Sequence, residues 1–340
     1  MGNKIMEFID SEEQRNLAAI LEPKGNMLAT RHLFEQADID AINAAIACRR
    51  PLLLTGEPGT GKSQLARAAA SRLECAFVSF SVDSRTESRD LLWSFDAVGR
   101  LADAQLGKAL CEDSTKLRGE LAIHNYVHPG PLWWGFDWAR AKEQAEKAQK
   151  RLGGTSDKEA IADIEPEQWD KGDPKNGCVI LIDEIDKAEP SVPNGLLEAL
   201  GNGCFLPDGY KQRIMVEGIA PLIIITSNEE RVLPEAFLRR CLVHHLSLPN
   251  EPEALIETLI ARGQAHFEDL SETLLKKAAK MVVRDRQKAQ DNHYHPLPGQ
   301  AAYIDLLRGV YQQADNAAKR EALLEKVRPY AVAKGFQPAL

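Results

Sequence analysis

The sequence has no long apolar run, and this excludes a membrane-spanning helix from the expected fold. Its longest uninterrupted apolar stretches are only about five residues, whereas a helix that crosses a bilayer needs about 20. Residues 1–20 are polar and include Asp10, Glu12 and Glu13, so we expect no secretory signal peptide. These absences predict a cytoplasmic protein with no membrane partner.

Cysteine is scarce and dispersed, which argues against the usual zinc and disulfide frameworks. The six cysteines lie at least 26 residues apart, and none forms a C-x-x-C pair. We therefore expect reduced, buried thiols, as is typical of a cytosolic protein. They are Cys48, Cys75, Cys111, Cys178, Cys204 and Cys241.

An excess of basic residues is also missing. Lys and Arg number 42 against 50 Asp and Glu, so the formal net charge is −8. This balance argues against a generic nucleic-acid surface. The 340 residues, of which 44% are hydrophobic and 27% charged, fit a globular protein of about two domains, or one α/β domain with a smaller appendage.

Three short apolar runs predict the centre of the fold. Helical patterns separate the runs, and a polar residue follows each one at once. Short continuous runs of this kind are typical of a parallel sheet buried on both faces, and such sheets bind ligands at the carboxyl ends of their strands. The runs are Leu52–Leu54, Val179–Ile182 and Leu222–Ile225, followed by Thr55, Asp183 and Thr226.

A glycine-rich loop lies between the first run and a predicted helix. Residues 56–63 fit the pattern G-x-x-x-x-G-K-[ST] without a gap. Glycines let backbone N–H groups turn inward around a phosphate. Lys62 supplies a charge for the β- and γ-phosphates, and Ser63 offers a hydroxyl to Mg²⁺. We therefore predict a nucleotide site, rather than a structural turn, made by Gly56, Glu57, Pro58, Gly59, Thr60, Gly61, Lys62, Ser63 and Gln64.

Polar residues that could bind a metal or take part in catalysis follow the other two runs. Asp183 would hold Mg²⁺, and Glu184 would orient and deprotonate an attacking water. Asn228 could reach the γ-phosphate or the water. Alone, the acidic pair reads as a solvated strand exit and Asn228 as a turn residue. Beside a phosphate loop, we favour the functional interpretation.

Two consecutive arginines, Arg239 and Arg240, follow Asn228 at short range. Alone, such a pair is usually a solvated helix end. In a ring-forming ATPase, an arginine of one subunit can reach the γ-phosphate in the next subunit and stabilise charge in the transition state. Both arginines are therefore candidate catalytic residues.

Together these motifs resemble those of the AAA+ ATPases, and more narrowly the MoxR and dynein-related branch. The resemblance covers roughly residues 30–310 and is carried by residues 50–63, 181–187, 226–228 and 234–240. It implies that residues 56–63 are Walker A, Asp183 and Glu184 are Walker B, and Asn228 is sensor 1. Arg240 best matches the arginine finger, with Arg239 beside it. Residues 90–98 resemble the segment in which this branch carries its helix-2 insert.

The same resemblance implies a fold and a way of working. The fold is the P-loop NTPase sheet sandwiched by helices, followed by a small all-helical lid. The family binds ATP with Mg²⁺, forms rings that are commonly hexamers, and remodels partner proteins. Partners in this branch often carry a von Willebrand factor A domain.

The predicted domain organisation has three parts. We expect a helical extension over residues 1–30, an α/β nucleotide-binding domain over 31–248 and a helical lid over 249–340. An insertion at about 100–176 enlarges the middle part, since the path from Lys62 to Asp183 is longer than a compact α/β unit requires. We expect residues 139–152 to be a solvated helix. Three of the five tryptophans fall in residues 125–138, either as core or as a partner-facing surface.

One departure from the family pattern affects the lid. Where relatives often carry a sensor-2 arginine, this sequence has Gln300 and Ala301, and the nearest arginines are Arg284, Arg286 and Arg308. Two other functions therefore stay open beside ATP-driven remodelling. One is a nucleotide-dependent assembly module with little hydrolysis. The other is a GTPase subunit of a nucleic-acid restriction system, against which the lack of an Asn-Lys-x-Asp motif after Asn228 argues.

Overall fold

The computed structural model describes residues 6–9, 19–21, 30–109, 114–149, 165–166, 168 and 172–332. The chain divides into two compact units. The first consists mainly of Ile39–Leu53 and Ala69–Val243, and the second of Asp10–Asp38, Leu54–Ala68 and the chain from His244 onward. The domain boundaries near residues 30 and 248 stay a prediction.

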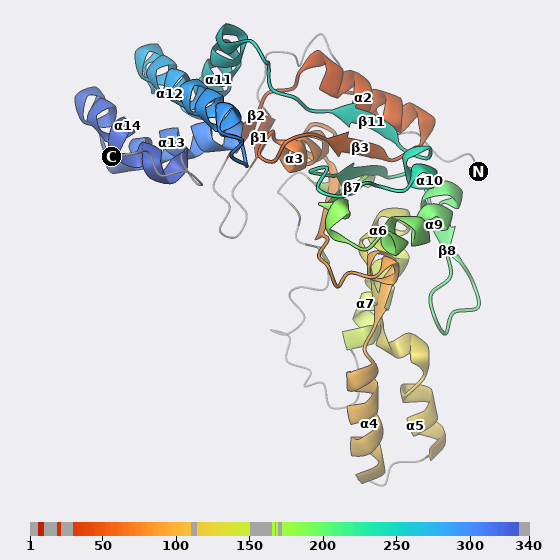
Figure 1. The fold of residues 1–340 in the computed structure, drawn as a ribbon. Helices are drawn as coiled ribbons and strands as arrows, with labels where there is room; N and C mark the ends of the chain where they lie inside the picture. The colour runs from red at the N-terminus through yellow and green to blue at the C-terminus, as the bar shows by residue number, and fades with distance from the viewer. Residues whose placement is uncertain are drawn as a thin grey trace. The chain divides into compact units, whose positions relative to one another are not determined.

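A five-stranded parallel sheet, with the strand order β11-β3-β10-β7-β4, organises the fold (Figure 1). Within the first unit, β10 and β4 both run parallel to β7, so that Ile223 and Val78 lie opposite Ile180 on its two sides. This confirms the predicted α/β fold with a parallel sheet and flanking helices. The strands are β3 (Leu52–Thr55), β4 (Cys75–Ser81), β7 (Asp173–Asp183), β10 (Leu222–Thr226) and β11 (Leu242–His245).

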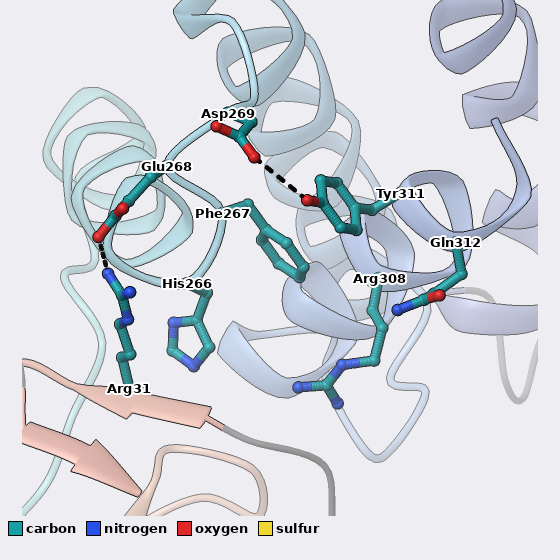
Figure 2. Close-up of a pocket in the computed structure, with 8 residues that line it drawn as sticks. All are labelled: Arg31, His266, Phe267, Glu268, Asp269, Arg308, Tyr311 and Gln312. Atoms are coloured by element: carbon teal, nitrogen blue, oxygen red, sulfur yellow. Dashed lines mark hydrogen bonds and ion pairs between the residues drawn. The ribbon is translucent and has the colours of Figure 1, made fainter. Parts of the chain in front are cut away.

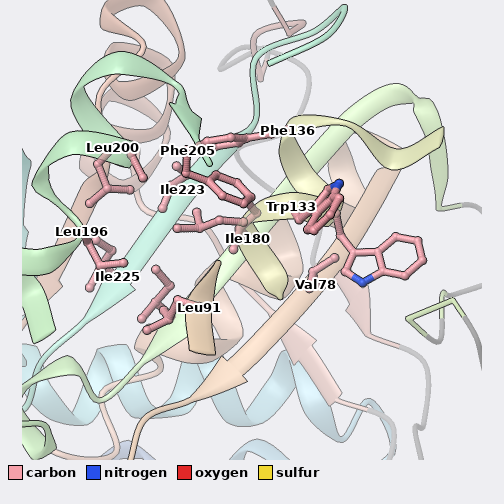
Figure 3. Packing of buried hydrophobic residues seen from close by; sticks show 14 of the residues in the cluster. Val78, Leu91, Trp133, Phe136, Ile180, Leu196, Leu200, Phe205, Ile223 and Ile225 are labelled. Carbon is pink, nitrogen blue, oxygen red and sulfur yellow. The ribbon is translucent and has the colours of Figure 1, made fainter. Parts of the chain in front are cut away.

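The core of the first unit includes the tryptophans whose role the sequence left open. Trp133 and Trp134, in α6 (Pro131–Phe136), are only 1% and 5% exposed. The Trp133 ring meets Phe205 and Tyr210 edge-on, at centroid distances of 5.9 and 5.4 Å. Figure 3 shows this region with the aliphatic side chains of the sheet. Core packing is thus confirmed for these two tryptophans, and the partner-facing interpretation is wrong for them.

Between β4 and β7 the chain forms a short antiparallel strand pair and several helices. Strands β5 and β6 pair with each other. Helix α7 is not the solvated helix that we expected, because Ala141, Gln144, Ala145 and Ala148 are buried. Residues 150–164 of the predicted insertion lie outside the described residues. The elements are η1 (Ser88–Leu91), β5 (Trp93–Phe95), α4 (Ala97–Ala109), α5 (Ser114–Glu120), η2 (Ile123–Tyr126), β6 (Val127–Pro129) and α7 (Trp138–Gln149).

Short elements follow β7 in the first unit. Strands β8 and β9 form an antiparallel pair, and α10 precedes the arginine pair. The elements are η4 (Ile185–Lys187), α8 (Ser191–Gly195), α9 (Leu197–Asn202), β8 (Cys204–Phe205), β9 (Ile214–Met215) and α10 (Glu235–Leu238).

The C-terminal part of the second unit is helical, as predicted. Its helices are α11 (Pro252–His266), α12 (Glu272–Asp291), α13 (Gln300–Gln313) and α14 (Ala317–Ala331). Two of them begin at capping side chains: Ser271 accepts the N–H of Leu274, and Asn316 accepts that of Lys319. Their apolar faces form one core.

The N-terminal segment differs from the helical extension that we expected. Where the structure describes it, the chain forms strand β1 (Ala19–Leu21), which pairs antiparallel with β2 (Thr30–His32). The rest of the expected extension lies largely outside the described residues. Helix α2 (Gln36–Cys48) follows. Over the part of the chain that the structure describes, no helix combines the length and the apolar character needed to cross a membrane.

Candidate functional site

The glycine-rich loop joins β3 to α3 (Lys62–Arg72) and bends at three glycines. Gly56, Gly59 and Gly61 have φ angles of 129°, 79° and 100°. At Gly56 a Cβ atom would also lie 2.1 Å from the carbonyl oxygen of Leu246, whose own N–H donates to the carbonyl of Thr55 at 2.9 Å. The backbone angle and the neighbouring chain therefore both require glycine at position 56.

The polar groups of the loop converge near Lys62, the first residue of α3. This lysine is only 6% exposed, and Nζ donates to the carbonyl oxygens of Gly56 (2.7 Å) and Glu57 (2.9 Å). Thr60 Oγ1 donates to the same Glu57 carbonyl at 3.0 Å. A buried ammonium group at a helix N-terminus, in a glycine loop of this shape, fits a phosphate group. Ser63, the next residue of α3, is half-buried.

Helices α12 and α13 of the second unit contact this loop. Nη2 of Arg286, on α12, donates to both carboxylate oxygens of Glu57, at 2.9 and 2.8 Å. The N–H of Ala301, in the first turn of α13, donates to the carbonyl of Gly59 at 3.2 Å. Arg286 is one of the three nearby arginines in the sequence, and no local pattern distinguishes it from the other two.

In the first unit, the ends of β7 and β10 bring three of the predicted residues together. Thr226 Oγ1 donates to Asp183 Oδ1 at 2.5 Å and accepts the N–H of Glu184 at 2.8 Å. Asn228 Nδ2 donates to Glu184 Oε1 at 3.1 Å. Lys187 forms an ion pair with the other carboxylate oxygen of Glu184, and this hydrogen bond raises the pKa of Lys187. Thr226 is therefore the link between the two strand ends.

Asp186 is a buried residue of this cluster that the sequence analysis did not single out. It is 2% exposed, and its Oδ2 accepts the backbone N–H groups of Asn228 (3.1 Å) and Glu230 (2.9 Å). Glu184 and Glu229 have φ angles of 60° and 61°, which is uncommon for residues other than glycine and recurs at functional sites. Asp186 thus fixes the turn that presents Asn228.

The arginine pair follows α10 and is exposed. Arg239 Nη2 pairs with Glu235 at 3.2 Å, and the side chain of Arg240 is also exposed. Arg50 donates to the carbonyl oxygens of Arg239, Arg240 (3.1 Å) and Cys241 (3.2 Å). The sequence motif included Arg50 but did not indicate this role, which is to hold the backbone beneath the two arginines.

The second unit also has a cavity of about 340 Å³ apart from the glycine loop (Figure 2). Arg31 pairs with Glu268 there, and the hydroxyl of Tyr311 donates to Asp269 at 3.3 Å. Its two arginines and two carboxylates leave no net charge that would select an ion. The lining residues are Arg31, His266, Phe267, Glu268, Asp269, Arg308, Tyr311 and Gln312, none of which belongs to the predicted site.

Comparison with solved structures finds distant similarities. A point mutant of RuvB from Thermotoga maritima is 16% identical, with 86% of this chain and 68% of that chain covered and a TM-score of 0.43. RuvB of the same organism, described as a Holliday junction branch migration motor, gives 16% identity, 86% and 67% coverage and a TM-score of 0.41. A protein from Cytophaga hutchinsonii described as a "putative ATPase" is 15% identical, with 86% of this chain and 78% of that chain covered and a TM-score of 0.36.

No curated protein matches the chain. Comparison with protein families gives a stronger result than the solved structures do. Residues 51–241, which are more than half of the chain, match the family described as "AAA domain (dynein-related subfamily)". The match spans the glycine loop, the acidic strand end, Asn228 and both arginines. The chain therefore belongs to the dynein-related subfamily of AAA domains.

Proposed function

We propose that the protein is an ATPase that binds ATP with Mg²⁺ and hydrolyses it. The observation that carries this proposal is the cluster in which Thr226 joins Asp183 to Glu184 and Asn228 contacts Glu184. Phosphoryl transfer to water needs a carboxylate for the metal, a base and a group that orients the water. The glycine loop supplies the further requirement, a set of groups that fits phosphates.

Each predicted residue has a role in this proposal. Lys62 and the backbone of residues 56–64 bind the phosphates, and Ser63 and Asp183 hold Mg²⁺, which when bound neutralises phosphate charge. Glu184 accepts the proton of the attacking water, and Asn228 holds that carboxylate in place. Among the described residues no group of three or more His, Cys, Asp and Glu forms a metal cluster. Mg²⁺ does not need one, because it is usually held by one or two side chains, phosphates and waters.

We further propose that the protein is of the MoxR type and works in the cytoplasm as a ring, with a hexamer as the expected assembly. Arg240, or Arg239 beside it, would reach the phosphates in the adjacent subunit. The exposure of both side chains and the support from Arg50 favour this role. Residues 31–248, with the insertion at about 100–176, would bind nucleotide, and residues 249–340 would move as a lid.

The work done by such a ring would be chaperone-like remodelling of a partner protein. The partner favoured by the MoxR resemblance carries a von Willebrand factor A domain. The five cysteines that the structure describes are free thiols, which is compatible with the reducing cytoplasm. A pulldown with an ATP-bound, hydrolysis-deficient variant would identify the partner.

The variant Glu184→Gln tests the proposed chemistry. It should retain ATP and lose turnover by a factor on the order of 10²–10⁴, because the amide cannot accept the proton of the water. Glu189→Gln is the matched control, since Glu189 is an exposed glutamate nearby whose ion pair with Arg231 lies at the surface. Turnover in Glu184→Gln equal to that of the control would refute the role of Glu184.

A second candidate function is a nucleotide-dependent assembly module with little hydrolysis. It is favoured by Gln300, which stands at the sensor-2 position and contacts Arg262 through its side-chain oxygen. Assembly size by analytical ultracentrifugation, together with phosphate release with and without partner, separates the two functions. Assembly on ATP with negligible release in both conditions would favour the module. Displacement of bound ATP by equimolar GTP would instead favour the GTPase function.

A further inference from the structure

The phosphate loop contains a negative charge of its own. Glu57 is the second residue of the loop, and its side chain is 45% exposed. Its carbonyl oxygen accepts from Lys62 and Thr60, so the residue is part of the framework that holds the loop lysine. A carboxylate so close to a proposed phosphate site would repel the phosphates unless another group neutralised it.

Arg286 supplies that neutralising charge. Its guanidinium contacts both oxygens of the Glu57 carboxylate through Nη2, while Nη1 donates to the carbonyl of Pro298 at 3.1 Å. The Arg286 side chain is only 9% exposed. The pair is therefore partly desolvated, and removal of the arginine would leave the carboxylate without its counter-charge.

The other polar residues near the lid contact do not take this role. Gln300 approaches Gly61, but its side-chain oxygen accepts from Arg262, which also pairs with Glu35 at 2.8 Å. Arg284 is exposed on α12, and Arg308 lines the separate cavity of Figure 2. Of the three arginines that the sequence offered, only Arg286 has a described contact with the phosphate loop.

We propose that Arg286 is the positioning residue through which the helical lid controls affinity for the nucleotide's phosphates. It acts through Glu57, by cancelling the carboxylate charge and by holding the peptide whose carbonyl accepts from Lys62. The proposal deepens the proposed function and rests on it. The contact that defines this role is the one between Arg286 and the Glu57 side chain of the loop.

The test compares ATP affinity by isothermal titration calorimetry between the wild type and variants of the full chain. Arg286→Gln should bind ATP about tenfold more weakly, which is ~1.4 kcal/mol, because Glu57 then repels the phosphates. Glu57→Gln should bind ATP about two- to threefold more tightly, since the positive charge of Arg286 is no longer cancelled. The double variant should regain most of the affinity lost in Arg286→Gln. Arg284→Gln, on the same helix, is the control and should match the wild type.

The opposite signs of the two single variants separate charge compensation from a merely structural role. If the ion pair only stabilised the fold, both single variants would weaken binding and the double variant would not recover. The loss in Arg286→Gln should also shrink from ATP to AMP and at high salt. If Arg286→Gln does not fold, weaker binding by Glu57→Gln alone still refutes the proposal.

The same experiment separates this inference from the proposed function. Lys62→Ala provides the reference for lost phosphate binding. If the wild type binds ATP no better than Lys62→Ala, the proposed function fails, and the inference fails with it. If the wild type binds ATP and Arg286→Gln binds it equally well, only the inference is refuted.

Discussion

Replacing Asp186 with alanine should disturb both stability and turnover, because one buried carboxylate holds the turn that carries Asn228. Oδ2 of Asp186 accepts two backbone N–H groups, those of Asn228 and Glu230. Hydrogen bonds to a charged acceptor contribute roughly 1.5–3 kcal/mol each, so their loss costs roughly 3–6 kcal/mol. Within the described structure, Oδ1 of Asp186 is buried without a hydrogen bond, and its removal returns roughly 1–3 kcal/mol.

The net expectation for Asp186→Ala is a loss of roughly 2–3 kcal/mol of unfolding free energy. Chemical denaturation monitored by circular dichroism measures this loss, and Asp208→Ala, which removes an exposed aspartate, is the control. Because Asn228 holds the Glu184 carboxylate in place in our proposal, turnover should fall by about tenfold or more while ATP affinity holds. Asp186→Asn keeps an oxygen acceptor and should lose about half as much stability. A stability within ~0.5 kcal/mol of the control and unchanged turnover would refute the reasoning.

Two further predictions concern the second unit. Gly56→Ala should lower the free energy of unfolding by roughly 2–5 kcal/mol, since φ is unfavourable and the new Cβ would meet the Leu246 carbonyl. The control Gly218→Ala, with φ of 73° but open space around it, should lose less stability in the same denaturation assay. Equal losses in the two variants would contradict the steric argument. Burial lowers the pKa of His32 to about 4 from 6.5, so the unfolded chain takes up the proton first as pH falls. The free energy of unfolding should drop by up to about 3 kcal/mol between pH 6.5 and 4. In the variant His32→Phe, the same denaturation assay should show a smaller dependence of stability on pH. An unchanged dependence in this variant would contradict the role of His32.

The sheet and the lid helices could be predicted because their signals are local. Residues 222–225 form one apolar run, and α12 has both an N-cap serine and a regular apolar face. The extent of β7 was less predictable. Its apolar run begins at Cys178, yet the strand starts at Asp173, because Asp173 pairs with Cys75 of β4 before a register shift that brings Cys178 opposite Ala76. Apolar patterns indicate which residues are buried, and they do not reveal pairing of exposed backbone.

Helix α7 shows how a real apolar face can be missed. Ala141, Gln144, Ala145 and Ala148 have the helical spacing of a buried stripe. The stripe reads as polar because alanine is small and glutamine carries an amide. That amide is satisfied inside the protein, since Nε2 of Gln144 donates to the carbonyls of His124 (2.7 Å) and Val127 (2.6 Å). The partners come from η2 and β6, so the sequence of the helix alone could not reveal them.

The N-terminal strand was missed for a related reason. Residues 19–21 adopt an extended conformation because they pair with residues 30–32, and three residues are too few to show a period of two. A strand of that length depends on its partner more than on its own propensity. The local sequence of residues 19–21 therefore could not reveal the strand, because the contact that decides it lies in residues 30–32.

The candidate site residues also differ in how far the sequence could predict them. The motifs revealed the residues proposed to touch nucleotide, because phosphate and metal chemistry restricts both their type and their spacing. The supporting residues obey no such spacing. On α12, consecutive residues meet different surroundings: Arg284 faces solvent, Asp285 is buried and pairs with Arg328 at 2.6 Å, and Arg286 contacts Glu57. Three charged residues in a row look like a solvated helix face, and only the partners, 43 and 229 residues away, distinguish the arginine that reaches the phosphate loop.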